Sequence, residues 1–498
     1  MSKVRLRLSG ALMFAANLVG YLTGFLFTVF ITRRLSEEEF GVWALIGSFI
    51  TYSLLPFNLV GSWISRDAAR GKRILSSAAA LFLLLTPISI IIYFSMALGS
   101  AAAINYDPGI IALGIIVLIP YILLTLGTAI QTGYAPQNLG IARIIFEISK
   151  VAIAFYLVVT LRLGLLGAFL SLSIAYLLQA TLLLKKSKPL FQKQISRNLI
   201  TKWVKGAPIN VIQALNNALA VTDTVLIGLI TGSAIATGYW QAAVTASTLV
   251  ASSSLLMTGL APRLLSGGSQ RDLDKVLDFT MMLAIPMLFG FLVLSKDILW
   301  ILRPTYSAAW IAASLLAIRG VAGILSRLGF LTVFGTDEFD KGENVSLKDY
   351  FKSRIFLLNK INLILSVLYV SSVSVFLLVT KTWSLSVVEL VTSVAAISLM
   401  FAILRSVINL KLMKKLTKLK LTYGNLSHYV AASIIMVALI YLLRTRIGQL
   451  PSRALEAAPP ILFLVILGAI IYGTILYVTN QDFRNLIKEA KIFVFGGV

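Results

Sequence analysis

Apolar runs recur from one end of the chain to the other, separated by short polar or basic segments. A helix needs about 20 residues to cross the hydrocarbon core of a bilayer, and these runs reach that length. The fold class indicated is an all-α polytopic membrane protein. The pattern predicts fourteen membrane helices, at about 9–32, 40–64, 74–97, 109–132, 142–161, 163–184, 206–230, 235–261, 276–295, 306–334, 354–379, 383–409, 427–446 and 458–479.

The charges of the loops set an orientation for these helices. With a cytoplasmic N-terminus, the inside segments hold 29 of the 44 Lys and Arg residues, whereas the outside loops hold nine. Short cytoplasmic loops of membrane proteins carry such an excess of positive charge. The pattern therefore predicts an even number of helices, with both termini in the cytoplasm.

The composition narrows the class of function. Of the 498 residues 58% are hydrophobic and 13% are charged, and the net charge is +24. The positive-inside pattern explains that charge, and no nucleic-acid-binding motif accompanies it, so we expect no nucleic-acid partner. Cysteine is absent, His428 is the only histidine, and no phosphate loop or nucleophile elbow occurs. We therefore predict neither an enzyme nor a resident cofactor, metal site or ATPase.

The basic segment 185–205 lies between the sixth and seventh predicted helices and suggests a boundary between two halves. The halves resemble each other weakly: Gly41-Val42-Trp43 and Gly238-Tyr239-Trp240 are 197 positions apart, as are Arg66 and Arg263. A parallel repeat of two six-helix bundles follows from this spacing. The predicted domains are a first bundle, a second bundle with a polar cytoplasmic insertion, and a basic loop with two helices and a tail, at 1–190, 191–410 (insertion 336–352) and 411–498.

Three short stretches carry a family resemblance: residues 32–43, which read TRRLSEEEFGVW, residues 223–228, which read DTVLIG, and residues 238–240. They resemble polysaccharide-biosynthesis (O-antigen-type) flippases of the multidrug/oligosaccharidyl-lipid/polysaccharide exporter superfamily. The resemblance covers about residues 10–410, and the last two predicted helices match that family's C-terminal pair. It implies two six-helix bundles around a central cavity that work by alternating access.

The resemblance also implies a substrate, which is a polyprenyl or dolichyl (di)phosphate carrying an oligosaccharide. This lipid would be flipped from the cytoplasmic to the outer leaflet of the plasma membrane by a protein that needs no partner except lipids and is able to work as a monomer. One alternative is a multidrug-type antiporter of small organic cations. Another is a membrane glycosyltransferase, which the short outer loops disfavour.

Charged side chains at membrane depth are costly and are therefore candidates for function. Arginine suits a phosphate because its guanidinium offers several donors in a planar fork. The candidates for substrate binding are Arg33, Arg34, Arg66, Lys150, Arg263, Arg319, Arg327, Lys360 and the polar Asn17.

Each of these candidates has a structural alternative. Arg66 and Arg263 could be ordinary cytoplasmic anchors, and Arg33 and Arg34 could pair with the acids at 37–39. Arg319 and Arg327 are eight residues apart, hence on roughly one helix face, where Lys360 could join them. They could line a cavity or neutralise an acid on another helix. Asn17 could simply form a hydrogen bond between helices.

Two acids are candidates for coupling transport to a cation. Asp223 lies in the seventh predicted helix near Asn216, Asn217 and Thr224, whose oxygens could help it to hold Na⁺, or it could carry a proton. The alternative is that Asp223 is paired with an Arg or Lys. Glu147 and Lys150 are one helical turn apart and are predicted to face each other, either as a structural pair or as a proton-responsive pair in the cavity.

Overall fold

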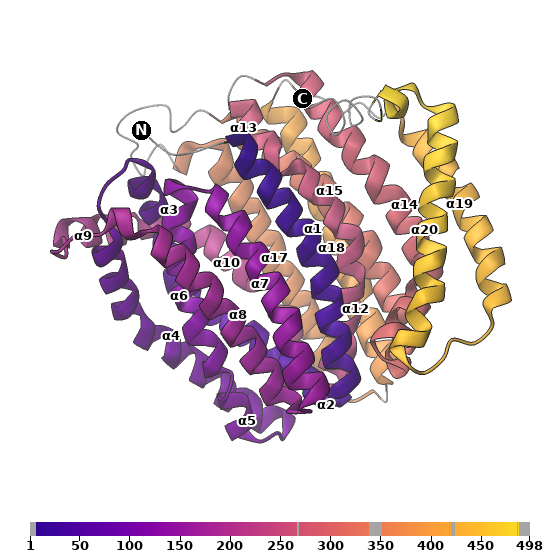
Figure 1. The fold of residues 1–498 in the computed structure, drawn as a ribbon, viewed down its shortest axis with the longest axis horizontal. Coiled ribbons are helices and arrows are strands. Elements are labelled where there is room, and N and C mark those ends of the chain that lie inside the picture. The colour runs from indigo at the N-terminus through magenta and orange to yellow at the C-terminus, as the bar shows by residue number, and fades with distance from the viewer. Residues whose placement is uncertain are drawn as a thin grey trace. The chain divides into compact units, whose positions relative to one another are not determined.

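The computed structural model describes residues 6–265, 268–337, 351–383, 385–417, 419, 424–485 and 487. Within these ranges the chain is helical and contains no strand, which confirms the predicted fold class (Figure 1). The helices are α1 (Leu6–Arg34), α2 (Glu37–Ser53), α3 (Leu55–Ala69), α4 (Leu75–Ile104), α5 (Pro108–Ala112), α6 (Ile115–Tyr134), α7 (Gln137–Ala154), α8 (Gly164–Lys186), α9 (Arg197–Gly206), α10 (Val211–Leu219), α11 (Thr222–Thr231), α12 (Ala234–Ala251), α13 (Leu260–Leu265), α14 (Gln270–Leu302), α15 (Trp310–Thr336), α17 (Arg354–Thr380), α18 (Val387–Leu416), α19 (Leu426–Ile447) and α20 (Ala454–Thr479).

Each of the fourteen predicted segments overlaps helical structure among the described residues. Among the described residues, nine helices are long and apolar enough to cross a membrane, or up to eleven if each of two bent pairs is one span. The chain is therefore a multi-pass membrane protein, and the number fourteen stays a prediction. Most of the polar insertion expected at 336–352 lies outside the described residues.

Two segments predicted as single helices are wrong in that detail, because each is broken and bent. The segment at 40–64 forms α2 and α3, which meet at 51°. In the segment at 206–230, the helical stretch Arg197–Leu219, which ends with α10, meets α11 at 50°. Pro56, in the first turn of α3, has no amide hydrogen to continue the bonding ladder of α2. At the second break, Oδ1 of Asp223 accepts a hydrogen bond from the Thr224 amide at 2.8 Å, which competes with continuous helix.

The helix contacts divide the chain into two compact units. Unit 1 comprises Met1–Gln241 and Phe339–Val391, and unit 2 comprises Ala242–Glu338 and Thr392–Val498. In unit 1, α6 packs against α8 and α3, and α7 packs against α1 and α8. In unit 2, α14 packs against α15, α19 and α20. The predicted division into two six-helix halves stays a prediction.

Close backbone approaches hold unit 1 together. A Cβ at Gly133 of α6 would lie 1.9 Å from the carbonyl oxygen of Ser65 in α3. A Cβ at Gly41 would lie 1.7 Å from the carbonyl oxygen of Ala234. Only glycine permits such contacts, which are typical of helix packing in membranes.

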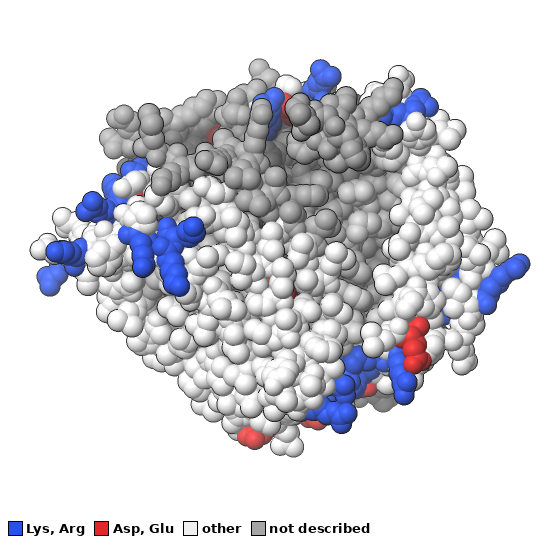
Figure 2. Space-filling view, viewed as in Figure 1, with Lys and Arg blue, Asp and Glu red and all other residues white. Residues whose placement is uncertain are grey.

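The outer surface of unit 1 is apolar along its helices. In Figure 2 the surface over α4, α6 and α8 is free of charged residues except near helix ends, and Lys and Arg gather around α9. On α4, Leu83 and Leu84 are 74% and 67% exposed. These faces suit contact with hydrocarbon, where a charge is costly.

Candidate functional site

A cavity of about 670 Å³ lies within unit 1, between α1, α6, α7 and α8. Its volume falls in the range of about 300–1,000 Å³ that is usual for small-molecule sites. Aromatic, hydroxyl and amide side chains line it together with one cluster of charges. The polar and aromatic residues of the lining are Asn17, Phe27, Thr28, Tyr121, Thr125, Thr128, Arg143, Phe146, Glu147, Lys150, Tyr176 and Gln179.

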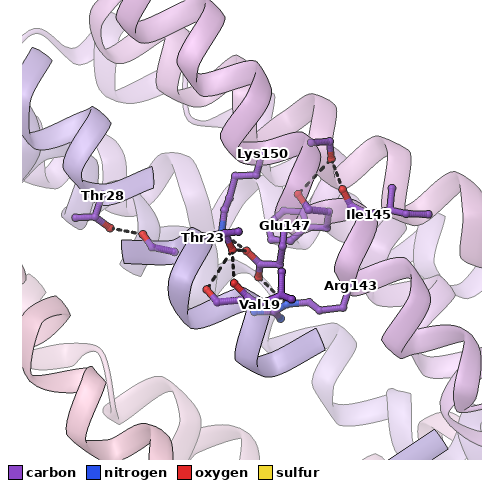
Figure 3. A network of polar contacts seen from close by, with 11 residues as sticks. Val19, Thr23, Thr28, Arg143, Ile145, Glu147 and Lys150 are labelled. Atoms are coloured by element: carbon purple, nitrogen blue, oxygen red, sulfur yellow. Dashed lines mark hydrogen bonds and ion pairs between the residues drawn. The ribbon is translucent and has the colours of Figure 1, made fainter. Parts of the chain in front are cut away.

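The charged cluster is centred on Glu147, which is 1% exposed. Its Oε2 accepts hydrogen bonds from Nζ of Lys150 at 2.5 Å and from the hydroxyl of Thr23 at 2.8 Å. Its Oε1 accepts one from Nε of Arg143 at 2.8 Å. Figure 3 shows Glu147 of α7 pointing toward α1, with Thr23, Arg143 and Lys150 around its carboxylate.

The helix spacing explains this cluster. Residues three and four positions apart lie on one helix face, so Arg143, Glu147 and Lys150 form a stripe along α7. Nζ of Lys150 also lies 5.4 Å from the ring centre of Phe27 and 5.0 Å from that of Phe146, where the ring faces attract a cation. The predicted contact of Glu147 with Lys150 is thereby confirmed.

A second cavity, of about 340 Å³, lies within unit 2 between α12 and α15. Arg319 and Arg327 both line it, with Gly320 and Gly323 between them on the same helix. Eight helical residues separate the two Cα atoms by about 12 Å along the axis. Among the described residues neither arginine has a hydrogen bond or an ion pair, so neither neutralises Asp223 or Glu147.

Asp223 is 4% exposed in the first turn of α11. Its Oδ2 accepts a hydrogen bond from the hydroxyl of Tyr369 at 3.0 Å, and its Oδ1 accepts from the Thr224 amide. No Arg or Lys among the described residues pairs with this carboxylate. The alternative, in which an Arg or Lys neutralises Asp223, is therefore not found among the described residues.

The amides predicted beside Asp223 have other partners. Oδ1 of Asn216 accepts a hydrogen bond from the hydroxyl of Ser366 at 3.1 Å. The exposed Asn217 accepts one from the side chain of Gln213 at 3.1 Å. Of the predicted group, only Thr224 contacts the carboxylate directly.

The remaining candidates lie outside both cavities. Arg66 is exposed on α3, with its guanidinium 5.0 Å from the ring centre of Trp63. Arg263 is exposed and pairs with Asp272 at 3.2 Å. Lys360 is exposed on α17, in unit 1, so it does not join the arginines of α15 within one unit.

Arg33 and Arg34 occupy the last turn of α1, where Arg34 is exposed. The next helix starts at once, because Ser36 and Glu39 form a reciprocal capping box. The backbone amide of Ser36 donates to Oε2 of Glu39 at 2.6 Å. Glu39, one of the three acids expected to pair with the arginines, therefore caps the N-terminus of α2 instead.

Two residues of these sites were missed by the sequence reasoning. Arg143 has a clear signal, because it precedes Glu147 by four positions and so lies on the same helix face. Tyr369 has none, because its contact with Asp223 joins residues 146 positions apart. Such a pairing depends on how α17 packs against α11, which hydropathy does not determine.

No protein-family model and no curated protein sequence matches the chain. Among solved structures, the lipid II flippase MurJ in its inward closed conformation matches with a TM-score of 0.60 at 14% identity, covering 95% of this chain and 99% of that one. The inward-facing conformation of a multidrug resistance MATE family transporter of the MOP superfamily matches with a TM-score of 0.58 at 11% identity, covering 82% and 99%. The resemblance predicted from the sequence is thus confirmed for the fold, which is that of MATE and MurJ transporters.

Proposed function

We propose that this protein is a flippase that moves a polyprenyl or dolichyl (di)phosphate-linked oligosaccharide from the cytoplasmic to the outer leaflet. It works by alternating access in the plasma membrane, with both termini in the cytoplasm, and a single copy of the chain suffices. MurJ, whose name describes a lipid II flippase, covers more of this chain than the MATE transporter does.

The observation that carries the proposal is the pair Arg319 and Arg327. Both line the cavity of unit 2, and neither has an ion-pair partner in the described part of the chain. Arg319 is half-buried and Arg327 is exposed, so both guanidinium groups are open to water and to a ligand that enters the cavity. A phosphate or diphosphate accepts several charge-assisted hydrogen bonds from such guanidinium groups. The hydroxyl of Ser254 supplies a further donor around this site, whereas those of Ser247 and Thr248 donate to backbone carbonyls of α12.

The balance of charge in the cavities argues against a carrier of organic cations. Such a carrier needs a carboxylate free to meet the cation. Glu147 is the one acid among the residues that line the two cavities, and Arg143 and Lys150 already pair with it. Neither lining therefore offers a free carboxylate, and the two arginines that line the cavity of unit 2 have no carboxylate partner in the described chain, which favours an anionic substrate there.

Cation coupling is part of the proposal, and Asp223 is its centre. A buried carboxylate bonded to the hydroxyl of Tyr369, with no basic partner in the described chain, is suited to hold a proton or Na⁺. Thr224 contributes its hydroxyl at 3.4 Å, and Asn216 and Asn217 would have to exchange their present partners to join. Glu147 is the weaker candidate because two cations already pair with it.

The test is flipping of a lipid-linked oligosaccharide by the purified chain in proteoliposomes. We expect Arg319→Ala/Arg327→Ala to lower the rate at least tenfold, and Arg319→Lys/Arg327→Lys to lower it less, because lysine keeps the charge but not the fork. Arg271→Ala, an exposed arginine of the same unit outside the cavity, is the control and should stay within twofold.

Two results would refute the proposal. If the double alanine variant flipped the lipid as fast as the wild type, the arginines would not carry the substrate. If the wild type flipped no such lipid and instead exported a small organic cation, the chain would be an antiporter.

A further inference from the structure

The cavity of unit 1 contains buried polar side chains that the charge network does not use. Gln179 is 7% exposed, lines the cavity from α8, and makes no hydrogen bond within the described residues. Leaving a buried amide without partners is unfavourable. Because its amide atoms are not among the buried unpartnered atoms of the described chain, they open into the cavity, where water or a ligand can bind them.

Four further neutral side chains of the lining, all half-buried, also lack a hydrogen-bond partner in the described chain. The side-chain amide of Asn17 and the hydroxyls of Tyr121, Thr128 and Tyr176 line the same cavity, and none of them donates or accepts a hydrogen bond within the described chain. They come from three helices, α1, α6 and α8. With Gln179 they offer both donors and acceptors, and none of these groups is charged.

The rings in the cavity form an ordered stack. Tyr176 lies between Tyr121 and Phe146, with ring centres 4.7 Å and 4.8 Å apart and planes within 7°. Arg143 lies over Phe146, with Cζ 5.7 Å from the ring centre. The stack fixes the two tyrosine rings, so that their hydroxyls are held in place rather than free to turn away.

This chemistry fits one class of ligand better than the others. A phosphate requires unpaired cations, but Lys150 is bound to Glu147 and Arg143 shares that carboxylate. An organic cation requires a free carboxylate, and an apolar compound would leave the amides unsatisfied. A neutral polyhydroxylated molecule both donates and accepts many hydrogen bonds, as these groups do.

We propose that the cavity of unit 1 is a carbohydrate subsite, in which Gln179, Asn17 and the hydroxyls of Tyr121, Thr128 and Tyr176 bind the neutral sugar of the lipid-linked substrate. The inference rests on the proposed function and deepens it.

Two kinds of variant test the subsite. Gln179→Leu removes the amide, and because that amide has no partner in the described chain its loss should not lower stability. Gly24→Leu fills the cavity, since a Cβ at Gly24 meets no atom within 4 Å. The control is Gly47→Leu on α2, where a Cβ also meets open space but which lies outside the cavity.

The probes are one polyprenyl diphosphate with a neutral N-acetylhexosamine disaccharide and the same lipid without sugar, both assayed in proteoliposomes. We expect Gln179→Leu and Gly24→Leu to lower flipping of the glycosylated lipid at least tenfold. Flipping of the sugar-free lipid should stay within twofold, and Gly47→Leu should change the flipping of neither lipid. Equal losses for both lipids, or no loss for either, would overturn the subsite while leaving the flippase standing.

If the wild type flips neither lipid, the proposed function fails and a second measurement decides the inference. Free neutral oligosaccharides of two to five units are added to the protein in nanodiscs, and saturation transfer from protein to sugar is recorded by NMR. Transfer that disappears in Gln179→Leu supports the subsite, and no transfer in the wild type overturns it.

Discussion

The cavities of the two units differ in how their charges are paired. In unit 1, Glu147 binds Arg143 and Lys150 directly, and the rest of the polar lining is neutral. In unit 2, Arg319 and Arg327 stand without a carboxylate in the described chain. Charges that are paired within the fold chiefly affect stability, whereas unpaired charges are available to bind a ligand. We therefore expect the charged residues of the unit 1 cavity to stabilise the fold and those of the unit 2 cavity to bind the substrate.

The largest effect on folding should come from breaking the pair in unit 1. Glu147→Gln leaves Lys150, whose side chain is 8% exposed, without its counter-charge. Removing one partner of a buried ion pair costs about 3–5 kcal/mol in the free energy of unfolding. The measurement is the unfolding of purified protein in detergent.

The matched control for this variant is Glu147→Gln/Lys150→Met, which replaces the buried charge with an apolar side chain of similar length. Most of the lost stability should return in the double variant, because no buried charge is left alone. A single variant as stable as the wild type would show that Lys150 finds water or another partner.

An ion pair inside unit 2, between Arg444 and Asp297, should stabilise the fold as the pair of Glu147 and Lys150 does in unit 1. Nε and Nη2 of Arg444 on α19 donate to the two oxygens of Asp297 on α14, each at 2.7 Å. Hydrogen bonds to a charged group contribute about 1.5–3 kcal/mol. We expect Arg444→Ala to lower the unfolding free energy by that amount, because Asp297, only 7% exposed, loses its cation.

Exposed Arg446, two positions further on in α19, offers a control for this pair. Arg446→Ala should leave stability unchanged in the same unfolding experiment. Equal stability of the two variants would mean that the bidentate pair adds nothing to the docking of α19 on α14.

Asp223 lies between the two cases, because it is buried but paired only with neutral groups. Tyr369→Phe removes the hydroxyl that donates to Oδ2 of Asp223 and should cost about 1 kcal/mol, the usual net value of one hydrogen bond. A double-mutant cycle with Asp223→Asn measures the coupling of the two side chains. Strictly additive effects would contradict a direct interaction between them.

The sequence predicted the helices well and the side-chain pairs unevenly, for a physical reason. Apolar runs of membrane length and Lys/Arg-rich loops are local features of the sequence, so every predicted segment overlaps helical structure among the described residues. The contact of Glu147 with Lys150 is local as well, because one helical turn joins them. The bends near Pro56 and Asp223 interrupt helices that remain apolar, so hydropathy does not reveal them.

Contacts between distant segments were beyond the sequence pattern. The pairing of Tyr369 with Asp223 and the placement of Gln179 and Tyr121 in one cavity depend on the rotation of packed helices. The spacing of Arg319 and Arg327 correctly indicated a shared face, but it did not indicate that Lys360 belongs to the other unit. Periodicity predicts which residues share one face of a helix, but it does not predict which other helix that face contacts.

The smallest effect on folding should come from the unpaired arginines of unit 2. Arg319→Ala/Arg327→Ala breaks no ion pair within the described chain, and it removes two like charges from one helix. We expect the unfolding free energy to change by no more than about 0.5 kcal/mol, as for substitutions that break no specific contact. Unfolding of the same preparation used for the flipping assay measures this directly. A loss of stability as large as that of Glu147→Gln would mean that the two arginines stabilise the fold, and the proposed difference between the two cavities would be wrong. Unchanged stability together with lost flipping assigns the two arginines to the substrate, because the fold then depends on neither guanidinium group while transport depends on both.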